Sequence, residues 1–283
     1  MSNAELDEDD DIKQEIQALA NLNVSNSTSI TKVPSSSSSS SSSSLSSFSF
    51  TDLPLNWQPN QGGHSPSQQL QNLLSEVGGP AAIKSFTSAF YKKAFLDPQL
   101  DQFIRDHDDP HGERFADWIV EKFSGDEVWT RKLQKRQTCP FSSHGHTFQT
   151  PHDRSSAHYA AWHSPKRLPG TFGDHFKLDD ARVWMRLHFW ALRETGGFER
   201  SPSFANYYVK FIGHFVSIYE RSATQFARES ARWSESEENT SNYLSTNPRR
   251  MPNVIGLKYS LAIKQLPAEE RDGNNNGQWP YDE

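Results

Sequence analysis

Between residues 66 and 231 the apolar positions recur every three or four residues, the spacing that places side chains on one face of an α-helix. Pro and Asp residues stand where several of these runs begin, and glycines stand where others end, as is typical of helix termini. The expected helices, in chain order, are Pro66–Val77, Pro80–Phe95, a short turn after Asp97-Pro98, Asp109–Ser124, Lys177–Thr195 and Pro202–Phe226. No run alternates as a strand does, so the pattern predicts an all-α protein.

The chain turns polar on both sides of this helical region. Residues 1–65 contain an acidic run and ten consecutive serines, Ser35–Ser44, and residues 232–283 are rich in Ser, Glu and Asn. Such segments bury too little apolar surface to offset the loss of backbone entropy on folding. We therefore expect an unstructured tail at 1–65, a helical domain at 66–231, and a mostly unstructured tail at 232–283 in which only Val254–Leu266 packs on the core.

Composition supports this division and narrows the possible partners. Aromatic residues make up 12% of the 283 residues, too many for a chain that is disordered throughout, although only 34% of the residues are hydrophobic. The 29 basic and 35 acidic residues leave a net charge of −6, and residues 1–50, with seven acids and two bases, carry −5 of it. Because the remainder is nearly neutral, we expect neither a nucleic acid nor a membrane surface as a partner.

Cysteine content and hydropathy indicate the compartment. The single cysteine, Cys139, excludes an intramolecular disulfide and fits a reducing environment. No apolar run approaches the length of a membrane span, and the acidic N-terminus lacks the pattern of a signal peptide. These features predict a soluble, cytoplasmic protein.

One of the eleven histidines stands in a distinctive context. His163 follows a run rich in small residues, Ser155–Ala161, and precedes Pro165, which discourages continuation of a helix. Lys166 and Arg167 come directly afterwards. A histidine in this position can bind a metal while the two cations reach a neighbouring anion, and the alternative is a packed histidine with a structural role only.

Four segments around this histidine resemble the truncated, two-over-two haemoglobins. Phe90-Tyr91, followed by KKAFLDPQLDQFI, is similar to that family's early helix, and the preceding GGPAAIKSF is similar to its opening. AWHSPKR resembles the segment of the proximal histidine, and LDDARVWMRLHFWAL resembles the following helix of the group II members, where a tryptophan faces the haem. The resemblance covers about residues 77–221, and Tyr91, His111, His163 and Trp184 follow the family order.

The resemblance implies a two-over-two globin fold, a haem b cofactor and His163 as the ligand of its iron. It also implies that Tyr91, His111 and Trp184 face the bound gas, where their donors stabilise a diatomic ligand that gains negative charge on iron. His111 would in addition be able to bind iron directly when no gas is present. The alternative for His111 is an exposed histidine in the first turn of its helix.

The residues can also be compared with what any haem site needs. Aromatic side chains such as Phe103 and Phe115 can line a flat apolar slot, and Lys166 and Arg167 can pair with the propionates. His111 lies four residues before Phe115, so both are expected on one helix face. An ordinary helical core would use the same aromatics, and an ordinary solvated surface would use the same cations.

The chain departs from the family pattern around the expected proximal segment. Residues 126–157 are longer than the usual connection, and extra residues separate His163 from the helix of Trp184. This segment is therefore aligned by its WHSP core alone. His158 and His175 are the rivals as iron ligand, and both lack the proline and cation context of His163.

Three functions remain open on this basis. The first is a haem globin that reversibly binds oxygen, nitric oxide or carbon monoxide, for transport, storage or sensing. The second is a haem enzyme acting on nitric oxide or peroxide, which would need an electron source, and the chain has no Gly-rich dinucleotide motif. The third is a cofactor-free helical interaction module with disordered tails. We favour a ligand-binding haem protein over a dedicated enzyme. A Soret absorption band in the purified protein would distinguish these two haem functions from the cofactor-free module.

Overall fold

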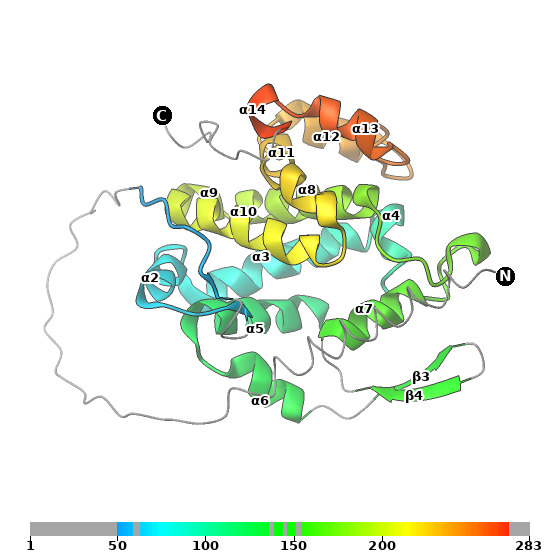
Figure 1. Ribbon diagram of the computed structural model, residues 1–283, viewed down its shortest axis with the longest axis horizontal. Coiled ribbons are helices and arrows are strands. Elements are labelled where there is room, and N and C mark those ends of the chain that lie inside the picture. The colour runs from blue at the N-terminus through cyan, green and yellow to red at the C-terminus, as the bar shows by residue number, and fades with distance from the viewer. Residues whose placement is uncertain (1–49, 59–62, 136–138, 144–145, 151–153, 272–283) are drawn as a thin grey trace, which may run out of the picture.

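The computed structural model describes residues 50–58, 63–135, 139–143, 146–150 and 154–271. Helices build the core of these ranges, which confirms the all-α class (Figure 1). The strands described here are two short antiparallel hairpins, β1–β2 (Trp57–Gln58 with Gly63–His64) and β3–β4 (Cys139–Ser143 with His146–Thr150). The sequence pattern predicted neither, because hairpins this short leave hardly any alternation to detect.

The helices follow the expected order, with further short elements between them. They are α2 (Gln68–Glu76), α3 (Gly79–Ala94), α4 (Pro98–Asp101), α5 (His111–Ser124), α6 (Val128–Gln134), α7 (Arg154–Trp162), α8 (Leu178–Glu194), α9 (Gly197–Arg200), α10 (Pro202–Ser217), α11 (Ala227–Trp233), α12 (Glu237–Ser245), α13 (Tyr259–Ala262) and α14 (Ala268–Arg271). The 3-10 turns are η2 (Pro169–Thr171), η3 (Arg221–Phe226) and η4 (Ile263–Gln265).

Local signals account for most of these helix ends. The hydroxyl of Ser67 accepts a hydrogen bond from the N–H of Leu70 and so caps α2, and α5 ends at Gly125, whose φ of 79° suits glycine. The predicted helix Pro202–Phe226 is shorter than expected, because Glu220 adopts an extended backbone and its carboxylate caps η3. Helix α10 therefore ends at Ser217, and the chain changes direction there instead of continuing as a helix to Phe226.

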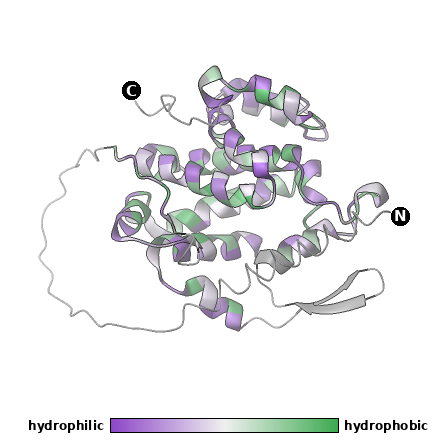
Figure 2. Ribbon diagram, in the orientation of Figure 1, coloured by the Kyte–Doolittle hydropathy of each residue, from purple (hydrophilic) through white to green (hydrophobic). Residues whose placement is uncertain are grey.

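The core is formed where α3 packs against both α5 and α8, while α10 contacts α2, α8, α9 and η3. Hydrophobic and hydrophilic segments alternate along these helices (Figure 2), as expected for helices with one buried face. The largest fully buried apolar side chains are Phe86, Phe90, Phe123, Phe189, Phe198, Phe204, Phe211, Phe226, Tyr207 and Tyr208. Helix α8 is the most enclosed, with 13 of its 17 residues buried, so it must be covered on more than one side.

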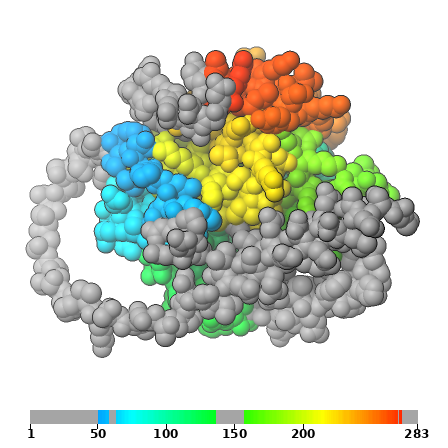
Figure 3. All heavy atoms as spheres, viewed as in Figure 1, coloured from blue at the N-terminus to red at the C-terminus, as the bar shows by residue number. Residues whose placement is uncertain are grey.

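The cover on the far side of α8 is the C-terminal segment α11–α14 (Figure 1), whose atoms lie across the top of the molecule in Figure 3. The expectation that only Val254–Leu266 would dock was too narrow. Tyr243 and Met251 are 2% exposed, and both carboxylate oxygens of Glu270 accept from Arg232 at 2.6 Å. Residues 232–271 therefore form a folded layer. Residues 272–283 lie outside the described ranges.

The described part of the predicted N-terminal tail is also packed. Leu53 is buried, the N–H of Thr51 donates to Ser203 Oγ at 2.8 Å, and the N–H of Asn56 donates to the Tyr207 hydroxyl at 3.1 Å. The His64 Nε2 atom lies 2.7 Å from the same hydroxyl. Residues 50–58 and 63–65 thus belong to the folded body, whereas residues 1–49 are not described. None of the described helices combines the length and apolar character needed to span a membrane.

Candidate functional site

A partly open cavity of about 260 Å³ lies among α3, α5, α7, α8 and α10. Its lining is mostly apolar and aromatic. Phe103 and Phe115, both predicted as haem-contacting residues, line it, and Phe103 packs edge-on against Phe176 at 4.9 Å between ring centroids. The volume is close to the lower end of the range of roughly 300–1,000 Å³ typical of ligand pockets.

Tyr91 of α3 and Trp184 of α8, the two residues expected to face a bound gas, line this cavity. Burial raises the pKa of the Tyr91 phenol well above its ordinary value, and the charge of Asp109 adds to the effect, so the hydroxyl stays protonated. Neither the Tyr91 hydroxyl nor the Trp184 indole N–H hydrogen-bonds to another residue in the described part of the chain. Both donors are therefore available to a ligand in the cavity.

The indole of Trp184 is held in place by His188, one helical turn later. The two rings stack at 4.5 Å with an interplanar angle of 9°, and His188 Nε2 lies 2.9 Å from the hydroxyl of Tyr208. His188 is fully buried, and burial lowers its pKa to about 3. The imidazole is therefore neutral at pH 7, and it fixes the indole without adding charge to the cavity wall.

His111 also lines the cavity, but its donor is already used. Its ring stacks on Tyr91 at 5.3 Å, and Nε2 lies 3.0 Å from the backbone carbonyl of Asp106. Because a carbonyl only accepts, Nε2 carries the hydrogen. Burial lowers the pKa of His111, so Nδ1 is an acceptor at pH 7. His111 therefore cannot donate to a gas from this position, and direct binding of iron through Nε2 would require the bond to Asp106 to break.

Helix α7 forms another wall and contributes His158, Ala157 and Ala161. The His158 ring lies edge-on to Tyr219 at 4.4 Å and to Phe176 at 5.5 Å between centroids. Alanines on either side of a histidine allow a flat ligand to approach the helix backbone closely. His158 is thus the histidine that α7 brings to the cavity.

His163, the predicted iron ligand, does not line the cavity. Its Nδ1 donates to the carbonyl of Tyr159 at 2.9 Å, and its Nε2 faces Gly173, where a Cβ would lie 3.5 Å away. Five residues separate His163 from His158, which corresponds to about 140° around a helix. Side chains so related cannot face the same side. The proline and cations that singled out His163 mark the end of α7, not the direction of its side chains.

The predicted anion partners, Lys166 and Arg167, also lie outside the lining. Lys166 pairs with Asp101 at 2.9 Å, and the Arg167 guanidinium sits 4.3 Å above the ring of Phe103 while donating to the carbonyl of Thr171. Among the described residues, the lining contains no Lys or Arg. Arg167 stacks on Phe103, which lines the cavity, and so it flanks the site without entering it.

Two carboxyl groups line the cavity where sequence reasoning expected none. They belong to Asp180 and Glu220. Burial raises the pKa of Asp180 to about 6, although its carboxylate accepts from the N–H of Lys177 at 2.8 Å and from Gln99 at 2.5 Å. Asp180 lies one turn before Trp184, so helical spacing from that tryptophan was the signal that could have found it.

No group of three or more His, Cys, Asp or Glu side chains in the described ranges is arranged to hold a metal ion. An iron already held by a porphyrin needs only one or two side-chain ligands, so this observation bears on bare metal ions alone. Comparisons with family models, curated proteins and solved structures found no match for this chain.

Proposed function

We propose that this chain is a haem-binding, globin-like protein that reversibly binds oxygen or another diatomic gas in the cavity. One observation carries the proposal. A histidine of α7, His158, and two available donors, Tyr91 of α3 and Trp184 of α8, line the same aromatic cavity. This combination supplies an axial ligand for iron and hydrogen bonds for a gas.

The lining residues fit a haem in their chemistry. The walls are apolar and aromatic, the alanines beside His158 leave room for a flat ring, and the raised pKa of Asp180 reduces negative charge near pH 6. The absence of Lys and Arg from the described lining implies that the propionates belong at the open side of the cavity. Arg167, which stacks on Phe103, and Lys166, which pairs with Asp101, are the candidate partners there.

Each residue then has a defined role. His158 would hold the iron, and haem when bound supplies the metal on which the gas coordinates. Tyr91 and Trp184 donate hydrogen bonds to the ligand, His188 orients the indole, and the apolar walls exclude water. The proposal thus gives the role of axial ligand to His158 instead of His163 and keeps Tyr91 and Trp184 as the donors to the gas.

Titration of the purified full-length chain with haem tests this assignment. Wild type is expected to give a Soret band, and His158→Ala to lose it or to show an altered ferrous spectrum that added imidazole restores. His163→Ala is the matched control, five residues further along and directly after the end of α7, and should retain the wild-type spectrum. A normal spectrum in His158→Ala together with a changed one in His163→Ala would reverse the assignment. No Soret band in wild type would favour the cofactor-free helical module instead.

Removal of either distal donor is expected to speed oxygen dissociation. In Tyr91→Phe and Trp184→Phe an aromatic side chain remains and the donor is lost, so the rate should rise by roughly tenfold for each hydrogen bond worth ~1.4 kcal/mol. Stopped-flow measurement of oxygen release reads this directly. Tyr259→Phe, at an exposed tyrosine outside the lining, is the control. Wild-type rates in both distal variants would show that neither residue contacts the gas.

A further inference from the structure

A phenol and a carboxylate form a buried pair on the side of α3 and α4 that faces the C-terminal layer. The hydroxyl of Tyr243 in α12 donates to Asp97 Oδ2 at 2.8 Å, and Asp97 is fully buried. The other oxygen, Oδ1, caps α4 by accepting from the N–H groups of Gln99 and Leu100. One carboxylate oxygen of Asp97 thus caps a helix, and the other accepts the hydrogen bond from the Tyr243 phenol.

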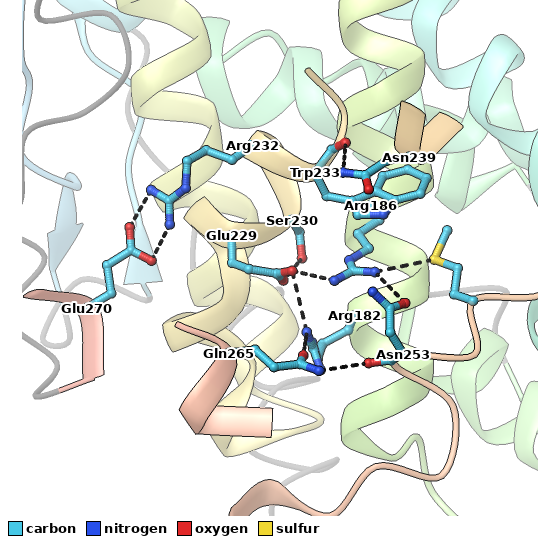
Figure 4. Close-up of polar contacts among 11 residues, drawn as sticks. Arg182, Arg186, Glu229, Ser230, Arg232, Trp233, Asn239, Asn253, Gln265 and Glu270 are labelled. Carbon is cyan, nitrogen blue, oxygen red and sulfur yellow. Dashed lines mark hydrogen bonds and ion pairs between the residues drawn. The ribbon is translucent and has the colours of Figure 1, made fainter. Parts of the chain in front are cut away.

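Two tryptophans complete a buried aromatic trio with Tyr243. The ring centroids of Trp190 and Trp233 lie 6.1 and 6.2 Å from that of Tyr243, and 6.3 Å from each other. Cations lie against both indoles: the Lys93 ammonium is 3.7 Å from the ring centre of Trp190, and the Arg186 guanidinium is 5.3 Å from that of Trp233. Figure 4 shows Arg186 beside Trp233.

The trio is continuous with the wall of the cavity. Asp97 lies between Ala94 and Leu100 in the chain, and both of these residues line the cavity. They belong to the same buried cluster as the trio, and Trp184 packs against that cluster. An electron can therefore pass between the trio and the cavity through packed aromatic and aliphatic groups, without crossing solvent.

We propose that Tyr243 is a redox-active residue that supplies one electron to an oxidant in the cavity, with Asp97 as the acceptor of its proton. This inference rests on the proposed haem function, with hydrogen peroxide as the terminal oxidant. In the step, the oxidant gains one electron, the phenolic O–H bond of Tyr243 breaks, and a new O–H bond forms on Asp97 Oδ2. The products are a neutral tyrosyl radical and a neutral carboxylic acid.

The surrounding charges favour Tyr243 over its neighbours as the residue that stays oxidised. An indole that loses an electron becomes a cation, which the ammonium of Lys93 and the guanidinium of Arg186 disfavour. A cation also lies near Tyr243, since the Arg249 guanidinium is 6.0 Å from its ring centre. What distinguishes Tyr243 from the indoles is that its proton can move to Asp97, so the oxidised residue is neutral. Burial raises the pKa of Asp97 above its ordinary value, which strengthens the carboxylate as a proton acceptor. Burial and Asp97 raise the pKa of Tyr243, so the phenol keeps its proton until an electron leaves.

Electron paramagnetic resonance tests the proposal on the haem-loaded, full-length chain, frozen shortly after mixing with hydrogen peroxide. Wild type is expected to show a tyrosyl signal that forms more slowly in D₂O, and Tyr243→Phe to lose it. In Asp97→Asn the amide oxygen can still accept the hydrogen bond from Tyr243, but it is a much weaker base than the carboxylate. Because it cannot take the phenol proton, the signal should fall and its formation should lose the solvent isotope effect. Tyr259→Phe, whose hydroxyl donates to Gln225 rather than to a carboxylate, is the matched control and should match wild type.

A second arm separates this inference from the haem proposal. Photogenerated tris(bipyridine)ruthenium(III), a one-electron oxidant in solution, is applied to the haem-free chain, and the tyrosyl radical is followed by its absorption. Loss of the radical in Tyr243→Phe supports the inference even if wild type binds no haem. A radical of unchanged yield and spectrum in Tyr243→Phe, in a protein whose circular dichroism matches wild type, overturns it. A role limited to holding α12 on α4 would change stability in Asp97→Asn and leave the isotope effect intact.

Discussion

Replacement of Glu229 by Ala is expected to lower the free energy of unfolding by about 3–5 kcal/mol, the usual effect of removing one partner from a buried ion pair. Glu229 lies between Arg182 and Arg186, which are 1% and 2% exposed (Figure 4). Its Oε1 atom is 3.4 Å from Arg182 Nη2 and in closer contact with Arg186 Nη2. Within the described residues it is the one carboxylate that pairs with either arginine, so two buried cations would lose their counter-charge.

Urea unfolding followed by circular dichroism measures this loss. Glu235→Ala is the matched control, because Glu235 pairs with Arg193 at 3.1 Å while its own side chain is 34% exposed. A solvent-accessible pair of this kind is worth about 0–1 kcal/mol. Equal losses in the two variants would mean that burial does not strengthen the Glu229 pairs. The same arginines also donate to Asn253 and Gln265, so the cluster joins α8 to the C-terminal layer.

Acidification is expected to destabilise the fold through two buried histidines. Burial lowers the pKa of His64 from 6.5 to about 4 and that of His188 to about 3. Between these values and 6.5 the unfolded chain binds more protons than the native one, so the free energy of unfolding falls as the pH falls. The stabilisation is fully present above pH 6.5 and is lost on the way to pH 4, by about 3 kcal/mol for each histidine at ~1.4 kcal/mol per pH unit.

The variants His64→Gln and His188→Gln isolate this effect. The raised pKa values of Asp180 and Asp97 act in the opposite direction, because their carboxyls bind protons more readily in the native state. The readout is therefore the slope of unfolding free energy against pH, which should be shallower in each variant than in wild type between pH 6.5 and 4. His107→Gln, at an exposed histidine, is the control. Wild-type slopes in both variants would contradict neutral burial of the two imidazoles.

Much of the helical framework could be predicted from the sequence because its signals are local. In α3 and α5 the three- and four-residue spacing of apolar side chains coincides with glycines and prolines at the ends. Backbone geometry alone relates such residues to one another, so no knowledge of the rest of the fold is needed. Tyr91 and Trp184 were expected near the site from the resemblance to the truncated haemoglobins, and Phe115 from the need for an aromatic wall; all three line the cavity.

The site residues that sequence reasoning misplaced depend on how a short helix docks. The proline and cations after His163 indicate where α7 ends, but the direction of each side chain is fixed by the rotation of the helix against Phe176 and Tyr219. That rotation brings His158 to the cavity and turns His163 toward Gly173. Lys166 likewise reaches Asp101, a partner 65 residues away in the chain.

The sequence by itself determined the all-α class, the principal helices and the aromatic faces they bury, because each follows from contacts within a few turns of chain. Only the tertiary structure decided which histidine enters the cavity and that residues 232–271 fold. The C-terminal layer is polar in composition, and its buried residues Tyr243, Met251 and Val254 pack in one cluster with Val183, Leu187 and Trp190 of α8. Whether these α8 side chains are buried depends on which segment packs against them. That contact cannot be read from the composition of α8 or of residues 232–271 taken separately.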